Sequence, residues 1–129
     1  MGVRIFLLLV GLGSAPYGIY CAINPGFLEG FAGVAATSTT GKIELVAMYG
    51  GLQTGLGILA LCGAFRPAYV HAALINVAFL LSGLGLFRLY AALSAGEFSS
   101  YTVQGMAFEL TFAAIAIFLL RRRSWVSSQ

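Results

Sequence analysis

The sequence contains no aspartate and only one lysine, Lys42. Charged residues make up only 9% of the chain and hydrophobic residues 60%, which excludes an ordinary soluble globular domain. The net charge of +3 matches the three consecutive arginines at positions 121–123, so the basic excess is confined to the end of a segment. This clustering indicates membrane orientation rather than nucleic-acid binding, and no nucleic-acid partner is expected.

Cysteine and histidine are also scarce. Cys21 and Cys62 are the only cysteines; they are too few for a disulfide framework and are expected near opposite faces of a bilayer, whereas a disulfide needs Cα atoms within about 7 Å. His71 has no second ligand at suitable spacing, so no metal and no cofactor is predicted. Ser14 and Ser82 have no adjacent base, which argues against a nucleophilic enzyme.

Four apolar stretches dominate what remains. At about 20 residues each, they are long enough to cross a hydrocarbon core of about 30 Å. We therefore predict an all-α fold, an integral membrane four-helix bundle that forms a single transmembrane domain over residues 1–129. Its first helix should be kinked at Pro16. The predicted helices cover about residues 3–23, 43–65, 69–93 and 103–120.

The charged residues between these stretches predict the orientation. Arg4, Arg66 and arginines 121–123 lie on one side of the topology, and Lys42 lies alone on the other. The positive-inside bias then places both termini in the cytoplasm, in a multi-pass protein of the cell inner (plasma) membrane. The loop 24–42 is expected at the outer interface, either as a lid over a pocket or as a plain connector. Thr40 could cap the second helix.

Small residues predict which helix faces pack, because membrane helices associate through close backbone approach. Each predicted helix carries such a stripe, and the fourth includes Glu109. In the second helix, Glu44 lies on the face of a GxxxG pair. The predicted stripes are Gly11, Ser14, Ala15, Gly18 and Ala22; Met48, Gly51, Gly55 and Cys62; His71, Ala78, Ser82 and Gly85; and Thr102, Gly105, Glu109, Ala113 and Ala116.

Glu44, Arg88 and Glu109 are ionisable residues within or at the edge of these apolar stretches, where a charge marks a paired group or a functional site. Counting from the inner helix ends places Glu44 and Arg88 at about 30 Å and Glu109 at about 18 Å from the inner boundary. Arg88 is expected to pair with Glu44 and to reach toward Glu109. With Tyr49 and Gln53, these residues form a predicted ligand-binding notch that opens outward.

A purely structural interpretation of the same charges stays open. Glu44 would then be a first-turn acid favoured by the helix dipole, and Arg88 an interfacial charge that extends toward water. Glu109 does not fit this alternative, because it is predicted to lie too deep to reach water unaided. A partner or a ligand is the better explanation for Glu109.

The second apolar stretch begins with the run Glu44-Leu45-Val46-Ala47-Met48-Tyr49-Gly50-Gly51-Leu52-Gln53, which Gly55 and Gly57 follow. This run resembles a signature of small bacterial four-helix membrane proteins classed as domain of unknown function 4345. The family pattern has an acid before an AMYGG segment, an arginine late in the third helix and an acid in the fourth, which Glu44, Arg88 and Glu109 match. The resemblance covers nearly the whole chain. It implies four spans and the polar triad, but no activity, substrate or cofactor.

Three functions are compatible with these features. The first is a small non-catalytic membrane protein that binds a lipid-like or quinone-like amphiphile in the polar notch, with membrane lipid as its partner. The second is an accessory or homo-oligomeric subunit of a larger membrane complex, which surplus small-residue faces favour. The third is a membrane isomerase-type enzyme that uses Glu109 as acid or base.

Overall fold

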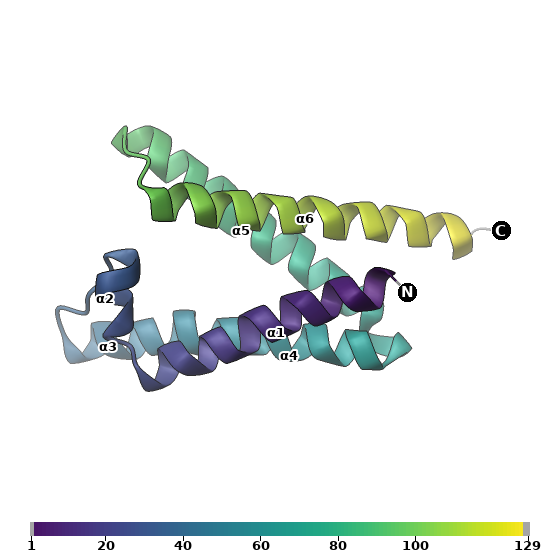
Figure 1. Ribbon diagram of the computed structural model, residues 1–129, viewed down its shortest axis with the longest axis horizontal. Coiled ribbons are helices and arrows are strands. Elements are labelled where there is room, and N and C mark those ends of the chain that lie inside the picture. Colours follow the sequence, from purple (N-terminus) through teal and green to yellow (C-terminus); the bar gives the residue numbers. More distant parts are fainter. Residues whose placement is uncertain (1, 128–129) are drawn as a thin grey trace. The chain divides into compact units, whose positions relative to one another are not determined.

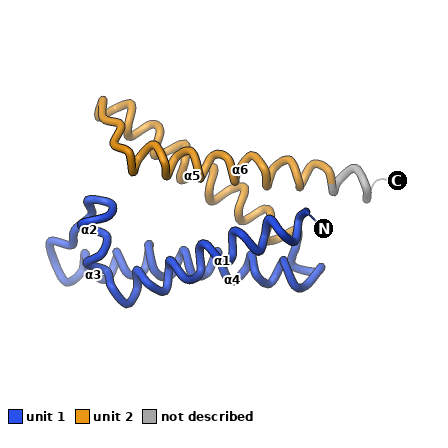
Figure 2. Tube along the Cα trace, in the orientation of Figure 1, with its two compact units in different colours: residues 1–70 blue, residues 71–129 orange. Residues whose placement is uncertain are grey.

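The structure is a computed structural model that describes residues 2–127 and, among these, the side chains of residues 2–122. The described chain is built from helices (Figure 1). It divides into two compact units, Met1–Val70 and His71–Gln129 (Figure 2). The side chain of Arg123, which enters the orientation argument, lies outside the described side chains.

In residues 2–127, four helices are long and apolar enough to cross a membrane, by length and composition. The predicted all-α fold and its four membrane-length helices are thereby confirmed. Assembly into one bundle in a single domain, cytoplasmic termini and the kink at Pro16 stay predictions. The four helices cover Gly2–Ile23, Thr39–Phe65, Pro67–Ala95 and Ser100–Arg122.

Unit 1 is organised around close packing of α1 (Gly2–Ile23) against α4 (Gln53–Phe65). A Cβ built on Gly57 would lie 2.6 Å from the Cβ of Ala15, and one built on Gly11 would lie 2.6 Å from Leu61 Cγ. Residue numbers increase along α1 where they decrease along the facing side of α4, so the two helices run antiparallel. The predicted small-residue stripe of α1 is the packed one, and it allows this approach.

The contact of the second predicted helix with α1 uses other glycines than the predicted Gly51 and Gly55. Gly50 and Gly57 meet α1, whereas a Cβ built on Gly51 or Gly55 would meet no atom of the described chain within 4 Å. The packing of the Gly51–Gly55 face against another helix stays a prediction. Gly50 and Gly57 have the small partners Ala22 and Ala15 opposite them on α1.

This second helix is also not a uniform α-helix. It consists of α3 (Thr39–Leu45), a π-helical segment η1 (Val46–Leu52) and α4. The wider turns of η1 change the angular relation between residues on either side of it, so α-helical spacing no longer links the faces of Glu44 and Gly51. The helix begins earlier than predicted, and Ser38 rather than Thr40 caps it, because the Ser38 hydroxyl accepts a 3.0 Å hydrogen bond from the Gly41 N–H.

The connection between α1 and α3 contains a short helix, α2 (Phe27–Ala32), which ends at Gly33 with a left-handed φ of 68°. Leu28 is fully buried. Tyr20 and Phe27 make an edge-to-face contact with ring centroids 5.1 Å apart, and Phe27 stacks on Phe31 at 4.9 Å. The long connection is therefore anchored by one leucine and three rings, while its predicted position at the outer interface stays a prediction.

The end of α4 follows from the Arg66-Pro67 pair. Arg66 is extended, with φ −123° and ψ 117°, as the residue before a proline prefers. A single 3₁₀ turn, η2 (Pro67–Tyr69), leads into α5 (Val70–Ala95). Proline thus ends the second membrane-length helix where the sequence predicted.

Unit 2 consists of most of α5 together with α6 (Ser100–Ser127). The connection is short: Gly96 has a left-handed φ of 67°, and the Ser99 hydroxyl accepts a 3.2 Å hydrogen bond from the Thr102 N–H. On α6, Glu109, Ala113 and Ala116 are buried, which confirms the predicted stripe. His71 is exposed, so it does not belong to the packed face of α5 that was predicted.

Candidate functional site

The strongest polar feature of unit 2 is an ion pair between Arg88 on α5 and Glu109 on α6. The Arg88 Nε donates a 2.9 Å hydrogen bond to Glu109 Oε2, and Nη2 donates a 2.7 Å bond to Oε1. Two parallel bonds of this kind fix both the position and the plane of a guanidinium. The side chain of Arg88 is 28% exposed and that of Glu109 is 9% exposed. The carboxylate is therefore the inner member of the pair.

Two glycines make room for this pair, one on each helix. A Cβ on Gly85 would lie 2.7 Å from Leu110 Cδ2 and 3.3 Å from the Cβ of Glu109. A Cβ on Gly105 would lie 3.4 Å from Arg88 Nε. Each glycine precedes its helix's charged residue by about one turn. The small-residue stripes thus let the helices approach closely enough for a direct bond between the two charges.

Tyr101 adds a third member to the site. The Arg88 Cζ lies 5.8 Å from the centre of the Tyr101 ring, within the range of a cation–π contact. The sequence analysis did not include Tyr101 in the polar notch. The available signal was its position about two turns before Glu109 on the same helix, together with the preference of arginine for aromatic faces.

The ion pair confirms that Arg88 reaches Glu109. The predicted depths of the two residues in a bilayer stay predictions.

The remaining predicted site residues belong to unit 1. Glu44 is exposed on α3, while Tyr49 in η1 and Gln53 at the start of α4 are half-buried. The pairing of Glu44 with Arg88 and the membership of Tyr49 and Gln53 in a common notch stay predictions. Sequence reasoning missed the π-helix around Tyr49, a type of segment that occurs frequently at functional sites.

Other chemistry has little basis among the described residues. No group of three or more His, Cys, Asp or Glu side chains lies together there in a way that could hold a metal ion. Cys21 is buried and Cys62 is half-buried, and both are free thiols. The arrangement that stands out is a bidentate, partly exposed guanidinium–carboxylate pair.

The comparisons with known proteins identify the family of the chain. No curated protein and no solved structure matches the chain. One family model does match, under the description "Domain of unknown function (DUF4345)", and the match covers residues 2–120, a range that includes Glu44, Arg88 and Glu109. The chain therefore belongs to the DUF4345 family.

Proposed function

We propose that this protein is a non-catalytic integral membrane protein that binds the polar head of a lipid-like or quinone-like amphiphile at the Arg88–Glu109 pair. The uneven exposure of the pair supports this, since Arg88 is 28% exposed and Glu109 is 9% exposed. The inner carboxylate orients the guanidinium, and the outer guanidinium meets a ligand. Guanidinium groups recognise acceptor oxygens such as those of phosphate, carboxylate or carbonyl groups.

The surroundings of the pair suit an amphiphile rather than a water-soluble ligand. The pair lies within two membrane-length helices, where water is scarce and every polar group needs a partner. Large apolar side chains next to it in sequence, Phe87 and Phe108, are exposed and would contact an acyl or isoprenoid tail. Because Glu109 already neutralises the Arg88 charge, the expected ligand is selected by hydrogen-bond acceptors more than by net charge.

Mass spectrometry of molecules that co-purify in a mild detergent tests this proposal. Wild-type protein is compared with Arg88→Gln, and with Arg4→Gln as a control that removes one exposed arginine elsewhere. We expect an amphiphile that is retained by the wild type and by Arg4→Gln and lost from Arg88→Gln, while circular dichroism shows the same helix content in all three. Retention at the wild-type level in a folded Arg88→Gln variant would sink the proposal.

One observation favours the second function, a homo-oligomeric or accessory subunit. The glycine pair Gly51 and Gly55 meets no atom of the described chain within 4 Å of a built Cβ, so this part of α4 and η1 could receive another helix. Sizing in mild detergent with light scattering tests it. A stable monomer whose mass does not change with protein concentration would count against self-association.

The third function, an isomerase with Glu109 as acid or base, gains no support from the geometry. Both oxygens of the Glu109 carboxylate accept hydrogen bonds from Arg88. A group held in this way serves to orient its partner rather than to exchange protons with a substrate.

A further inference from the structure

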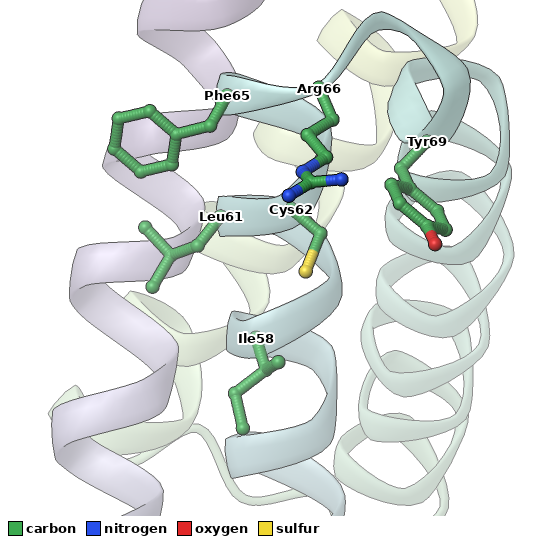
Figure 3. Close-up of a pocket in the computed structure, with 6 residues that line it drawn as sticks. All are labelled: Ile58, Leu61, Cys62, Phe65, Arg66 and Tyr69. Carbon is green, nitrogen blue, oxygen red and sulfur yellow. The ribbon is translucent and has the colours of Figure 1, made fainter.

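A second arginine of the chain lies in a pocket in unit 1, at the end of α4. The pocket has a volume of about 450 Å³ and is lined by Ile58, Leu61, Cys62, Phe65, Arg66 and Tyr69. Its side chains come from the last two turns of α4 and from the 3₁₀ turn η2. The Arg66 side chain extends back along α4 toward Cys62, with the Tyr69 ring on its other side (Figure 3).

Arg66 differs from Arg88 in having no ion-pair partner among the side chains of residues 2–122. Among the side chains that the structure describes, none forms an ion pair or a hydrogen bond with the Arg66 guanidinium. The positive charge of the exposed Arg66 is therefore not neutralised by the described chain. A negatively charged ligand would complement it.

The position of Arg66 at the end of a membrane-length helix indicates which class of ligand the pocket suits. The second membrane-length helix ends at Phe65, so Arg66 and Tyr69 follow directly at its polar end, the level at which arginine and tyrosine meet lipid head groups. Below them, Ile58 and Phe65 are 52% and 70% exposed. The pocket thus combines a cation and a phenol at its polar end with an apolar wall of acyl-chain character.

We propose that this pocket binds an anionic phospholipid. Its phosphate would meet the Arg66 guanidinium and the Tyr69 hydroxyl, and one acyl chain would lie along Ile58 and Phe65. The site is distinct from the Arg88–Glu109 pair, because it belongs to the other unit. Charge complementarity favours a lipid with net negative charge over a zwitterionic one.

Cys62 provides a readout at the site itself. It lines the pocket and is half-buried, whereas Cys21 is 0% exposed and reports unfolding. The alkylation rate of each thiol is measured by peptide mass spectrometry in nonionic detergent, with added dioleoylphosphatidylglycerol or dioleoylphosphatidylcholine. We expect the anionic lipid to slow alkylation of Cys62 at an about five-fold lower concentration than the zwitterionic lipid, the difference expected for one arginine at an anionic surface.

Three variants assign this effect to the pocket. Arg66→Gln should abolish the difference between the two lipids, Arg66→Lys should retain part of it, and the matched control Arg4→Gln should retain all of it. Equal protection by both lipids in the wild type, or an unchanged lipid preference in folded Arg66→Gln, would overturn the proposal. If Arg66→Gln exposes Cys21 to alkylation, Tyr69→Phe replaces it, with a reduced lipid preference expected and an unchanged one counting against the site.

Two further arms separate the lipid from other occupants. Inorganic phosphate at millimolar concentration should leave the alkylation rate of Cys62 unchanged; protection by phosphate alone would assign the site to a free anion. Protection that rises with protein concentration in the absence of lipid would assign the pocket to a second copy of the chain. Either result rejects the phospholipid proposal without affecting the Arg88–Glu109 experiment.

Discussion

At the scale of single residues, the two glutamates predicted to lie in a polar notch have different environments. Glu109 is buried and bonded to Arg88 by two hydrogen bonds, whereas Glu44 is exposed. Substitution of Glu109 should therefore lower the free energy of unfolding more than substitution of Glu44. An exposed acid contributes little to stability, while a buried acid that loses its cation leaves an uncompensated charge.

Removing one partner of the Arg88–Glu109 pair should cost more than removing both. We expect Arg88→Met to lower the free energy of unfolding by about 2 kcal/mol, because it leaves the Glu109 carboxylate without its partner. The double variant Arg88→Met with Glu109→Leu should recover part of that loss. Denaturation in mixed micelles, followed by circular dichroism, measures the coupling as a double-mutant cycle. Strictly additive losses would contradict a direct energetic link.

Replacing Glu44 gives the contrasting result at the same scale. Glu44→Gln should change the free energy of unfolding by no more than about 0.5 kcal/mol, as expected for an exposed group away from any packed contact. The same micelle denaturation assay applies. A loss as large as that of Arg88→Met would show that Glu44 has a buried partner, as the sequence alone suggested.

At the scale of elements, the helices of each unit approach one another at particular glycines, while other glycines of the same helices have no close neighbour. In unit 1, Gly57 faces Ala15 of α1, while Gly55, two residues earlier on α4, meets nothing of the described chain within 4 Å. In unit 2, Gly85 faces Leu110, while Gly83 has no such neighbour. Each packed glycine thus has an open glycine nearby as a matched control.

Alanine should destabilise the protein at the packed glycine positions. At the open positions it should leave the stability unchanged or increase it. In unit 1, Gly57→Ala forces a methyl group against the α1 backbone and should cost about 2 kcal/mol. Gly55→Ala adds helix propensity without a clash and should stabilise by up to about 1 kcal/mol. Thermal unfolding in detergent compares the two variants. Equal effects would mean that α1 does not pack on the Gly57 face.

The same comparison in unit 2 tests the support of the ion pair. Gly85→Ala places a methyl group close to Leu110 and Glu109, so it should separate the helices and weaken the Arg88–Glu109 coupling measured by the double-mutant cycle. Gly83→Ala should leave the coupling unchanged. Because the contacting atoms of Leu110 belong to a flexible side-chain end, the cost should be smaller than for Gly57→Ala, at about 1 kcal/mol. An unaltered coupling in Gly85→Ala would show that the pair does not need this close approach.

At the scale of the whole molecule, the predicted topology has both termini in the cytoplasm. Cysteine labelling in intact cells tests it, in a Cys62→Ala background with the buried Cys21 retained. Thr37→Cys, before α3, should react with a membrane-impermeant maleimide added outside. Ala68→Cys, in η2, should react only after the membrane is permeabilised. The reverse pattern would invert the topology, and reaction of both without permeabilisation would remove the membrane span between them.

The sequence predicted the number and type of the long helices well, because length and apolar composition alone determine whether a segment can cross a membrane. It predicted the small-residue stripes of α1 and α6, because small residues recur there at the spacing that returns to one helix face. It did not predict that Gly50 and Gly57 contact α1, because the second helix carries two series of glycines and local spacing does not say which one has small residues opposite it. The π-helix η1 was missed for a related reason, since its register depends on hydrogen bonds that composition does not specify.

The amino-acid sequence alone therefore specifies the class of the molecule, with four apolar helices, few charges, and acids and arginines within or beside membrane-length segments. How those charges are used depends on the way the helices pack. Arg88 and Glu109 come together because Gly85 and Gly105 let α5 and α6 approach closely. Arg66 has no described acid beside it because α4 ends at Phe65 and leaves it in a pocket of largely apolar side chains. Ion pairing depends on distances of a few ångströms between helices, and that separation is a property of packing rather than of composition.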